Sequence, residues 1–404
     1  MSEAFEEVAV RQSTLEEAHR RAGATFAERE GLSIPAHYGD ASEEYEAVRG
    51  ASGAGLIDLS SRGRIEVGGA EAVQFLNGLI TNDVKTLAEG AWMSAAFPNV
   101  QGRLLAHARV LHRAPGTFLF DTEAATRASI YRTLARFTLA GDFRVVDRTD
   151  ETVMLSLQGA RAPEIVRSLL GAEAVSVERG RVHSERWRDS FVTLIRATHT
   201  SEDGFDIFLE ADAAPAFWEA ALAAGARAVG FEALDVLRVE AGVPRYGVDM
   251  TDANVVLEAG LDDAVSFTKG CYVGQEIIAR IHWRGHVAKR LAGLSFAEGD
   301  ADTPASGSKI RTTDGKEIGR LTSVVRSPRL RLTVALGYVK YDYLKPGTEV
   351  RVESGEQEHP AEVAELPFVR GSWFAAAKTK ATEATEATEA TEVSGAGDRE
   401  EGTT

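Results

Sequence analysis

The chain has 404 residues, of which 44% are hydrophobic and 26% charged, and its formal net charge is −16. These values are typical of a folded protein with two or three domains. The negative charge argues against broad binding to DNA and disfavours direct binding to RNA, because both require a positive surface. No run of about 18 apolar residues occurs, so we expect no segment that crosses a membrane.

The single cysteine, Cys271, cannot form a disulfide within the chain, which is typical of a reducing compartment. The first ten residues contain Glu3, Glu6 and Glu7 and no long apolar run, so we expect neither a secretory signal nor an Arg-rich transit peptide. The sequence therefore predicts a cytoplasmic protein.

The first predicted element is a helix over residues 13–22, because Ser13 and Glu16 have capping-box spacing and Gly23 follows. It belongs to an expected N-terminal extension of residues 1–44. Strand-like runs follow at 56–59, 64–67, 103–111, 117–121, 153–157, 191–197 and 205–209. Helical patterns lie around 73–80 and at 124–136, 163–170, 213–224 and 231–241. This mixture predicts an α+β domain over residues 45–287.

After residue 290 the helical patterns stop, and short strands alternate with turns at Asp314-Gly315, Ser327-Pro328 and Pro346-Gly347. This pattern predicts a C-terminal β-barrel over residues 288–371. Four Ala-Thr-Glu repeats then occupy residues 381–392. We expect residues 372–404 to form a disordered acidic tail.

Common catalytic signatures are missing from the sequence, including the nucleophile elbow, the zinc-protease helix, the Walker loop and the Rossmann glycine pattern. His282 and His286 have i,i+4 spacing, but Gly285 interrupts the helical pattern between them. An ordinary polar surface explains the pair better than a metal site does. We therefore predict no metal centre.

The segment from Lys269 to Glu276 is the strongest candidate site. Lys269 stands two residues before Cys271, and a helical pattern begins at Gln275. An ammonium group and a helix N-terminus would both favour the thiolate, and Gly270 and Gly274 would let a ligand approach the backbone. The alternative is a buried structural cysteine in a glycine-rich turn.

These eight residues match the K-G-C-Y-x-G-Q-E signature of the YgfZ proteins, so the chain resembles that family over residues 45–371. YgfZ proteins are folate-binding relatives of the glycine-cleavage T protein that support iron–sulfur proteins. The resemblance implies two intertwined α+β subdomains and a barrel around a central tetrahydrofolate site. It places Lys269, Tyr272, Gln275 and Glu276 at the folate, with Cys271 as the reactive or partner-contacting group that Lys269 tunes.

Two further blocks resemble the wider aminomethyltransferase superfamily. Residues 202–207 are similar to its E-D-G-F-E-I block, and residues 237–242 to its L-R-L-E-A-G block. The resemblance implies that Glu202 and Arg238 bind folate. A carboxylate can accept the paired donors of a pterin, and a guanidinium can donate to its acceptors. The alternatives are a surface turn for Glu202 and an intrahelical ion pair for Arg238.

One stretch departs from the aminomethyltransferases. Their N-x-x-G-G-I-x-D-D pattern supplies a catalytic aspartate, whereas this chain has Ala106 and His107 in place of the two aspartates. Glycine-cleavage activity is therefore not expected. His107 either titrates near neutral pH or forms a polar wall.

A basic run, with Arg280, His282, Arg284, His286, Lys289 and Arg290, follows the signature. It could receive a folate tail, an acidic partner or RNA, or it could be a solvated helix face.

The resemblance predicts a tetrahydrofolate-binding protein that supports assembly or repair of iron–sulfur proteins, including enzymes that modify tRNA. Because one cysteine cannot ligate a cluster alone, such a role requires partner proteins. The enzymatic alternative is a tetrahydrofolate-dependent aminomethyltransferase, one-carbon transferase or demethylase that uses Cys271. A third hypothesis is a plain folate-binding scaffold with an inert cysteine.

Overall fold

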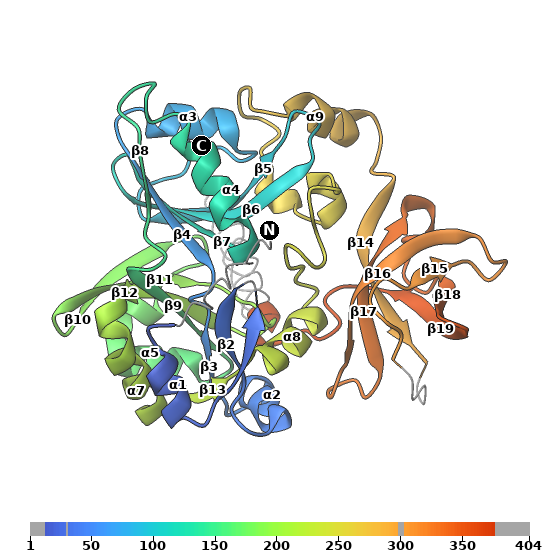
Figure 1. Cartoon of the computed structure of the whole chain (residues 1–404), viewed down its shortest axis with the longest axis horizontal. Coiled ribbons are helices and arrows are strands. Elements are labelled where there is room, and N and C mark those ends of the chain that lie inside the picture. The colour runs from blue at the N-terminus through green and yellow to red at the C-terminus, as the bar shows by residue number, and fades with distance from the viewer. Residues whose placement is uncertain (1–12, 30, 298–302, 376–404) are drawn as a thin grey trace, which may run out of the picture.

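The computed structural model describes residues 13–29, 31–297 and 303–375. Two lobes of mixed helix and strand lie beside a closed β-barrel (Figure 1). The predicted α+β fold with a C-terminal barrel is confirmed. Within the described ranges, no helix is long and apolar enough to cross a membrane.

The first lobe is built on a five-stranded sheet with the order β5-β6-β7-β4-β8. Its strands are β4 (Gly63–Gly68), β5 (Ala91–Pro98), β6 (Leu104–Ala114), β7 (Thr117–Thr122) and β8 (Arg144–Asp147). Its helices are α3 (Ala72–Leu79) and α4 (Ala124–Ala135). Alternate residues of the strands, such as Ile65 and Val67, are fully buried with Leu76 of α3 and Ile130 of α4. The apolar residues of the strands, which alternate along the chain, and those of the two helices thus pack into one core.

The second lobe holds a six-stranded sheet with the order β10-β11-β12-β9-β3-β13. Its strands are β3 (Gly55–Asp58), β9 (Thr152–Gln158), β10 (Val182–Trp187), β11 (Ser190–Arg196), β12 (Gly204–Glu210) and β13 (Arg227–Val229). Its helices are α2 (Ala41–Arg49), α5 (Ala162–Leu170), α6 (Ala172–Val175), α7 (Ala214–Ala223) and α8 (Phe231–Glu240). The short 3-10 turn η1 (Ala211–Ala213) precedes α7.

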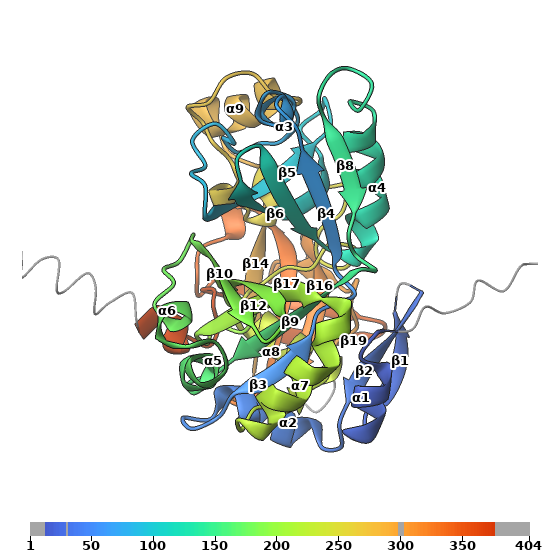
Figure 2. The ribbon, with the colours of Figure 1, turned by 90° about the vertical axis from the view of Figure 1, so that its left-hand side faces the viewer.

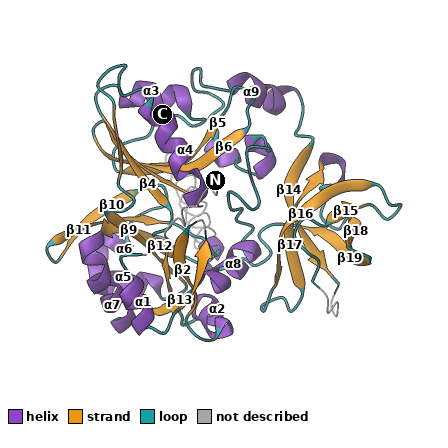
Figure 3. Ribbon diagram, in the orientation of Figure 1, coloured by secondary structure: helices purple, strands orange, loops and turns teal. Residues whose placement is uncertain are grey.

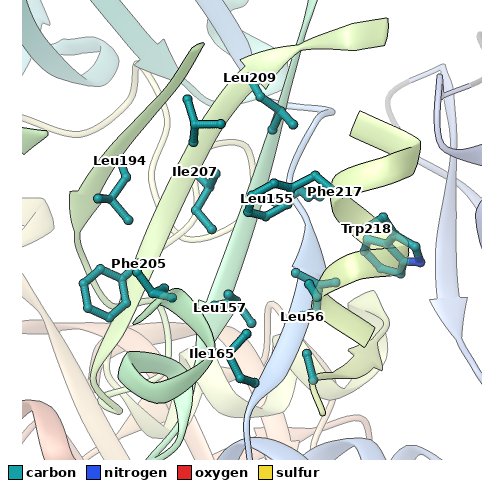
Figure 4. Packing of buried hydrophobic residues seen from close by; sticks show 14 of the residues in the cluster. Leu56, Leu155, Leu157, Ile165, Leu194, Phe205, Ile207, Leu209, Phe217 and Trp218 are labelled. Carbon is teal, nitrogen blue, oxygen red and sulfur yellow. The ribbon is translucent and has the colours of Figure 1, made fainter. Parts of the chain in front are cut away.

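Helices cover this sheet on both faces (Figure 3). On one face, sheet side chains such as Leu155 and Ile207 point toward α7, where Phe217 and Trp218 meet them (Figure 4). On the other face, α2 and α8 pack through Val48 and Leu237. Strands buried on both faces explain why β9 and β12 have nearly continuous apolar sequences.

The two lobes are intertwined because consecutive strands belong to different sheets. Strand β3 pairs with β9 and β13 in the second lobe, whereas β4, which begins at Gly63, pairs with β7 and β8 in the first. Viewed from the side, the lobes lie one above the other with the barrel behind them (Figure 2). Residues 59–62 therefore cross between the lobes.

The N-terminal segment is more than the predicted helical extension. Helix α1 (Glu16–Arg21) is present, and the antiparallel strands β1 (Thr25–Arg29) and β2 (Leu32–His37) follow it. Their residues are mostly half-buried or exposed, without a clean alternation, so sequence periodicity gave no signal for the hairpin.

The barrel closes in the order β14-β17-β16-β15-β18-β19. Its strands are β14 (Lys289–Phe296), β15 (Lys309–Arg311), β16 (Glu317–Arg326), β17 (Thr333–Lys340), β18 (Glu349–Ser354) and β19 (Gln357–Ala364). The connection from the lobes contains η2 (Val256–Ala259), η3 (Asp262–Ala264) and α9 (Gln275–Arg284), and η4 (Tyr341–Tyr343) follows β17.

The described end of the chain returns to the second lobe. The backbone N–H and the hydroxyl of Ser372 donate to Glu202 Oε2 at 2.8 and 2.6 Å, and the N–H of Trp373 donates to the carbonyl of Ser201 at 3.1 Å. Of the predicted disordered tail, residues 376–404 lie outside the described residues, whereas 372–375 are tied to the lobe.

Candidate functional site

A cavity of about 100 Å³ lies where the N-terminal hairpin, both lobes and α8 meet. Its charged and polar lining comes from residues of both lobes, namely Asp58, Ser61, Arg62, Glu123, His199, Asp235, Arg238 and Arg245. Its apolar lining comes mostly from the hairpin, β3 and α8, namely Ile34, Pro35, Ile57, Leu59, Val229, Phe231, Leu234, Val243 and Pro244. A cavity lined by both apolar and charged residues suits a planar ligand with a polar edge.

A chain of buried charges stands behind the polar wall and joins the lobes. Arg62 donates to both carboxylate oxygens of Asp121, at 2.7 and 3.0 Å. Arg109 donates to Asp121 at 2.7 Å and to Asp206 at 2.5 Å. His199 Nε2 is 2.9 Å from Asp206. Strand β6 of the first lobe is thus bonded to β12 of the second through full charges.

Asp121 and Asp206, the two aspartates among these buried charges, are ionised. Burial alone would raise the pKa of Asp206, but His199 and Arg109 bring it well below its ordinary value. Asp121 is also fully buried, and Arg109 and Arg62 lower its pKa in the same way. Two negative charges that do not titrate near neutral pH therefore stand behind the cavity wall.

Arg238 is the predicted folate ligand that lines this cavity. Its guanidinium also holds α8 to the barrel, since it donates to Asp235 at 2.9 Å, to Asp249, and to the hydroxyl of Ser323 in β16 at 2.6 Å. Burial opposes its charge, yet Asp249 and Asp235 keep the pKa of Arg238 above its ordinary value.

Glu202 is buried outside the cavity lining. Its Oε1 accepts a hydrogen bond from Arg49 at 3.0 Å, and its Oε2 is taken by Ser372. The carboxylate that the sequence predicts as a folate ligand therefore holds residue 372, near the last described residue, against the second lobe. Asp206, four residues later, is the carboxylate of this block that reaches the wall through His199.

The signature loop packs on the first lobe rather than around this cavity. Lys269 is buried, and its ammonium donates to the carbonyl oxygens of Ile80 at 2.9 Å and Asn82 at 2.6 Å. Burial lowers the pKa of Lys269 to about 8, while Asp83 opposes that shift. Lys269 thus anchors the loop, and the predicted tuning of Cys271 stays a prediction.

Cys271 is exposed, so the alternative of a buried structural cysteine is wrong. Gly274 has φ +76°, and a Cβ there would overlap the carbonyl oxygen of Asn99, which explains the glycine. Gly270 has open space around it. Tyr272 is buried in the cluster with Leu104 and Ile278, and Gln275 and Glu276 begin α9. None of these residues lines the cavity.

The structure places the departure from the aminomethyltransferase pattern on β6. Ala106 is fully buried, and His107 Nε2 lies 2.7 Å from the hydroxyl of Ser94. Burial, together with the charge of Arg62, lowers the pKa of His107 to about 4. His107 is therefore neutral at pH 7, and the expectation that it could titrate near neutrality is wrong.

The proposed pair of histidines after the signature is split between two aromatic partners. His282 stacks on Phe267 and His286 on Tyr341, each with ring centroids 3.6 Å apart. Within the described ranges no group of three or more metal-binding side chains occurs.

Comparison with known proteins agrees with this architecture. The model of the GCVT N-terminal domain matches residues 15–269, and that of the glycine cleavage T-protein C-terminal barrel domain matches residues 289–370. The chain belongs to the glycine-cleavage T-protein family. Its membership in the YgfZ branch of this superfamily stays a prediction from the signature.

Relatives of the family cover nearly the whole chain. An aminomethyltransferase from Saccharopolyspora erythraea is 31% identical over 365 residues, which cover 89% of this chain and 98% of the relative. One from Rubrobacter xylanophilus is 32% identical over 362 residues, covering 89% and 95%. The crystal structure of glycine cleavage system aminomethyltransferase T from Bartonella henselae superposes with a TM-score of 0.81 at 27% identity, covering 89% and 98%.

Sequence reasoning missed His199, Asp206 and Arg109 as site residues. Asp206 stands in the same six-residue block as Glu202, but a local block does not show which carboxylate lies behind the cavity wall. The sequence did contain one signal for this residue. Asp206 is a charged residue in the middle of the apolar strand β12, where it must be paired.

Proposed function

We propose that the chain binds tetrahydrofolate in the cavity between the lobes and transfers a one-carbon unit at the aminomethyl level. The observation that supports this most is His199 in the cavity lining, hydrogen-bonded to the ionised Asp206 behind it, together with the apolar residues that α8 adds to the same lining. A pterin is flat and apolar on its faces, and it has donors and acceptors along its edge. His199 and Arg238 would meet this edge, while Phe231 and Leu234 would cover a face.

The family relatives named aminomethyltransferase support this chemistry over the iron–sulfur role. In an aminomethyl transfer, one folate nitrogen bonds to the one-carbon unit as the bond to the donor group breaks, and the donor takes up a proton. A second folate nitrogen bonds to the same carbon as ammonia leaves with the other proton, so the carbon bridges two nitrogens as a methylene group at the same oxidation level. The reaction therefore needs no oxidant.

The replacements Ala106 and His107 make the reaction different from glycine cleavage as the family carries it out. No carboxylate stands at these two positions, and His107 is neutral. The carboxylates that line the cavity are Asp58, Glu123 and Asp235. Glu123 accepts from Arg62 at 2.5 Å and Asp235 accepts from Arg238, so Asp58 is the carboxylate here that no arginine contacts.

A titration with tetrahydrofolate tests the binding site. We expect saturable binding by the wild type and a loss of at least tenfold in affinity for His199→Ala and for Leu234→Trp, which fills the apolar side. Glu202→Gln is the matched carboxylate control and should bind normally. Absence of saturable binding by the folded wild type would overturn the proposal.

An assay for methylene-tetrahydrofolate tests the chemistry. Purified protein, tetrahydrofolate and an aminomethyl donor should release the folate product together with ammonia. N-methylated amines serve as the comparison, because their methyl carbon is more reduced and should not react without an oxidant. Folate binding without any product would leave a binding protein and remove the transferase assignment.

Support of iron–sulfur proteins is the second candidate function, favoured by the exposed Cys271 on a loop that Lys269 holds in place. An accessible thiol on an anchored loop can contact a partner protein. Complementation of a strain with defective iron–sulfur enzymes tests it, with Cys271→Ala as the variant. Normal complementation by Cys271→Ala would leave a scaffold with an inert cysteine, whereas its failure with folate binding intact supports this role.

A further inference from the structure

A second cavity, of about 280 Å³, adjoins the folate cavity on the side of the N-terminal segment. The two cavities share three lining residues, Ile34, Asp58 and Ser61. The outer wall comes from Ser13, Thr14 and strand β2, and the inner wall from β4 and residues 149–153. We call this space the second chamber. It could hold a small molecule, since one water needs only roughly 10–15 Å³ of such space.

Hydroxyl groups dominate the lining of the second chamber. They belong to Ser13, Thr14, Ser33, Ser60, Ser61, Thr149 and Thr152. The apolar lining is limited to Leu32, Ile34 and Val153. Hydroxyls can donate or accept, so this wall suits a polar ligand rather than an apolar one.

The inner wall carries a buried cation. Arg64 is 1% exposed, and its guanidinium donates to the carbonyl oxygens of Arg62, Ser60, Thr149 and Thr152 and to the hydroxyl of Thr152. All of these acceptors are uncharged. Burial lowers the pKa of Arg64 to about 10, so it remains a cation at neutral pH. The charges of Asp121 and Asp58 oppose this shift, although neither carboxylate accepts one of the hydrogen bonds given above. A buried cation whose direct partners are all uncharged favours an anionic group beside it.

A carboxylate occupies the side of the chamber next to the folate cavity. Asp58 lines both spaces, and its side chain lies 2.9 Å from Nε2 of the buried His19. Burial raises its pKa, but the bonds to His19 and Ser60 bring the pKa of Asp58 below its ordinary value. Its longest contact is that with the Ser13 hydroxyl, at 3.2 Å, which an incoming donor would displace first.

We propose that the second chamber binds a small α-amino acid, with its carboxylate toward Arg64 and its ammonium group toward Asp58. The charged side chains that line the chamber are Arg64, Asp58 and Asp150, and Asp150 pairs with Arg127 at 3.1 Å. A zwitterion with one charge of each sign therefore matches Arg64 and Asp58. Its amino group would lie at the wall shared with the folate cavity. The inference goes beyond the proposed function, because the amino acid is a ligand bound beside the folate cavity and takes part in no step of the transfer.

Binding of simple probes to the full chain tests the inference. Glycine and alanine carry both charges, acetate carries only the carboxylate, and ethylamine carries only the ammonium group. We expect glycine or alanine to bind at least tenfold more tightly than either single-charge probe. Equal binding of acetate and alanine, or no saturable binding of any probe, would overturn the proposal.

Two variants test the location. Arg64→Met removes the cation, and Ser33→Trp fills the chamber from the half-buried hairpin without touching Arg64. Both should lose amino-acid binding by tenfold or more, whereas Arg113→Met, which removes an arginine from β6 outside the chamber, should not. If Arg64→Met does not fold, Ser33→Trp decides alone, and undiminished amino-acid binding by it contradicts the proposal.

A tetrahydrofolate titration on the same proteins separates this inference from the proposed function. Ser33→Trp should still bind tetrahydrofolate if the folate cavity is intact. If the wild type binds folate but no amino acid, the proposed amino-acid site is wrong and the folate proposal stands. If the wild type binds an amino acid but no folate, the folate proposal is wrong and the amino-acid site in the second chamber stands.

Discussion

At the scale of single residues, the charged groups around the cavity between the lobes differ in their hydrogen-bond partners. Asp121 and Asp206 are committed to arginines and a histidine, whereas Asp58 is committed to His19, which has its other nitrogen 2.8 Å from the hydroxyl of Tyr38. The first group forms fixed structure. The second is a hydrogen-bonded relay that ends at the wall shared by both cavities.

His107 gives a prediction for the pH dependence of stability. Its pKa in the folded protein is about 4, against 6.5 when unperturbed, so the unfolded chain binds a proton first as the pH falls. The contribution of His107 is complete above pH 6.5 and is lost toward pH 4, at up to ~1.4 kcal/mol per pH unit. We expect His107→Gln to show a shallower fall in the free energy of unfolding between pH 7 and 5. Parallel curves in urea denaturation would contradict it.

Lys269 and Cys271 should behave oppositely in stability measurements. Lys269→Met leaves the carbonyls of Ile80 and Asn82 without their donor, which should lower the free energy of unfolding by about 1–3 kcal/mol. Cys271→Ser changes an exposed side chain and should shift it by less than about 0.5 kcal/mol. Denaturant titration of both variants checks this. If Lys269→Met leaves the free energy of unfolding unchanged, the hydrogen bonds of Lys269 do not contribute to stability.

At the scale of elements, the signature loop works as the entry to helix α9. The turn of residues 99–102 packs on it, since Gly274 touches Asn99 and a Cβ at Gly102 would press on Ile277 and Ile278. The turn of residues 99–102 and the signature loop, which are more than 160 positions apart in the sequence, thus pack against each other. Gly102 and Gly274 therefore permit the close approach of these two segments, whereas Gly270 does not take part in it.

The two glycines of the signature separate these roles. Gly274→Ala forces a side chain into the left-handed region and onto the Asn99 carbonyl, so we expect a loss of about 1–3 kcal/mol in the free energy of unfolding. Gly270→Ala is the matched control, because its Cβ would meet open space. Comparable losses for both variants in denaturant titration would show that the close approach at Gly274 is not what matters.

At the scale of the whole molecule, a few buried carboxylates hold the barrel against the lobes. Asp249 is 1% exposed and accepts from the hydroxyls of Thr322 and Ser323 at 2.6 Å and from Arg238. Glu240, fully buried, accepts from Tyr45 and from Ser327 of the barrel. The barrel therefore positions Arg238 at the cavity.

Removal of Asp249 should loosen this docking. Asp249→Ala leaves Arg238 buried without that charge, which we expect to cost about 3–5 kcal/mol in stability. Hydrogen exchange should rise in α8 and β16 and remain unchanged in β5 and β6 of the first lobe. Exchange that rises equally across the first lobe would indicate general unfolding instead.

The sequence by itself determined the types of most elements, the barrel and the family resemblance, since these follow from local periodicity, turn residues and a short motif. It left open which charged residues face the cavity. Arg109 and Asp206 are 97 positions apart and meet only because β6 and β12 belong to facing sheets. The roles of Glu202 and Lys269 were likewise decided by distant partners, Ser372 and the carbonyls of the first lobe. A buried charge must be paired, and its partner comes from a distant part of the chain, so no local sequence pattern identifies that partner.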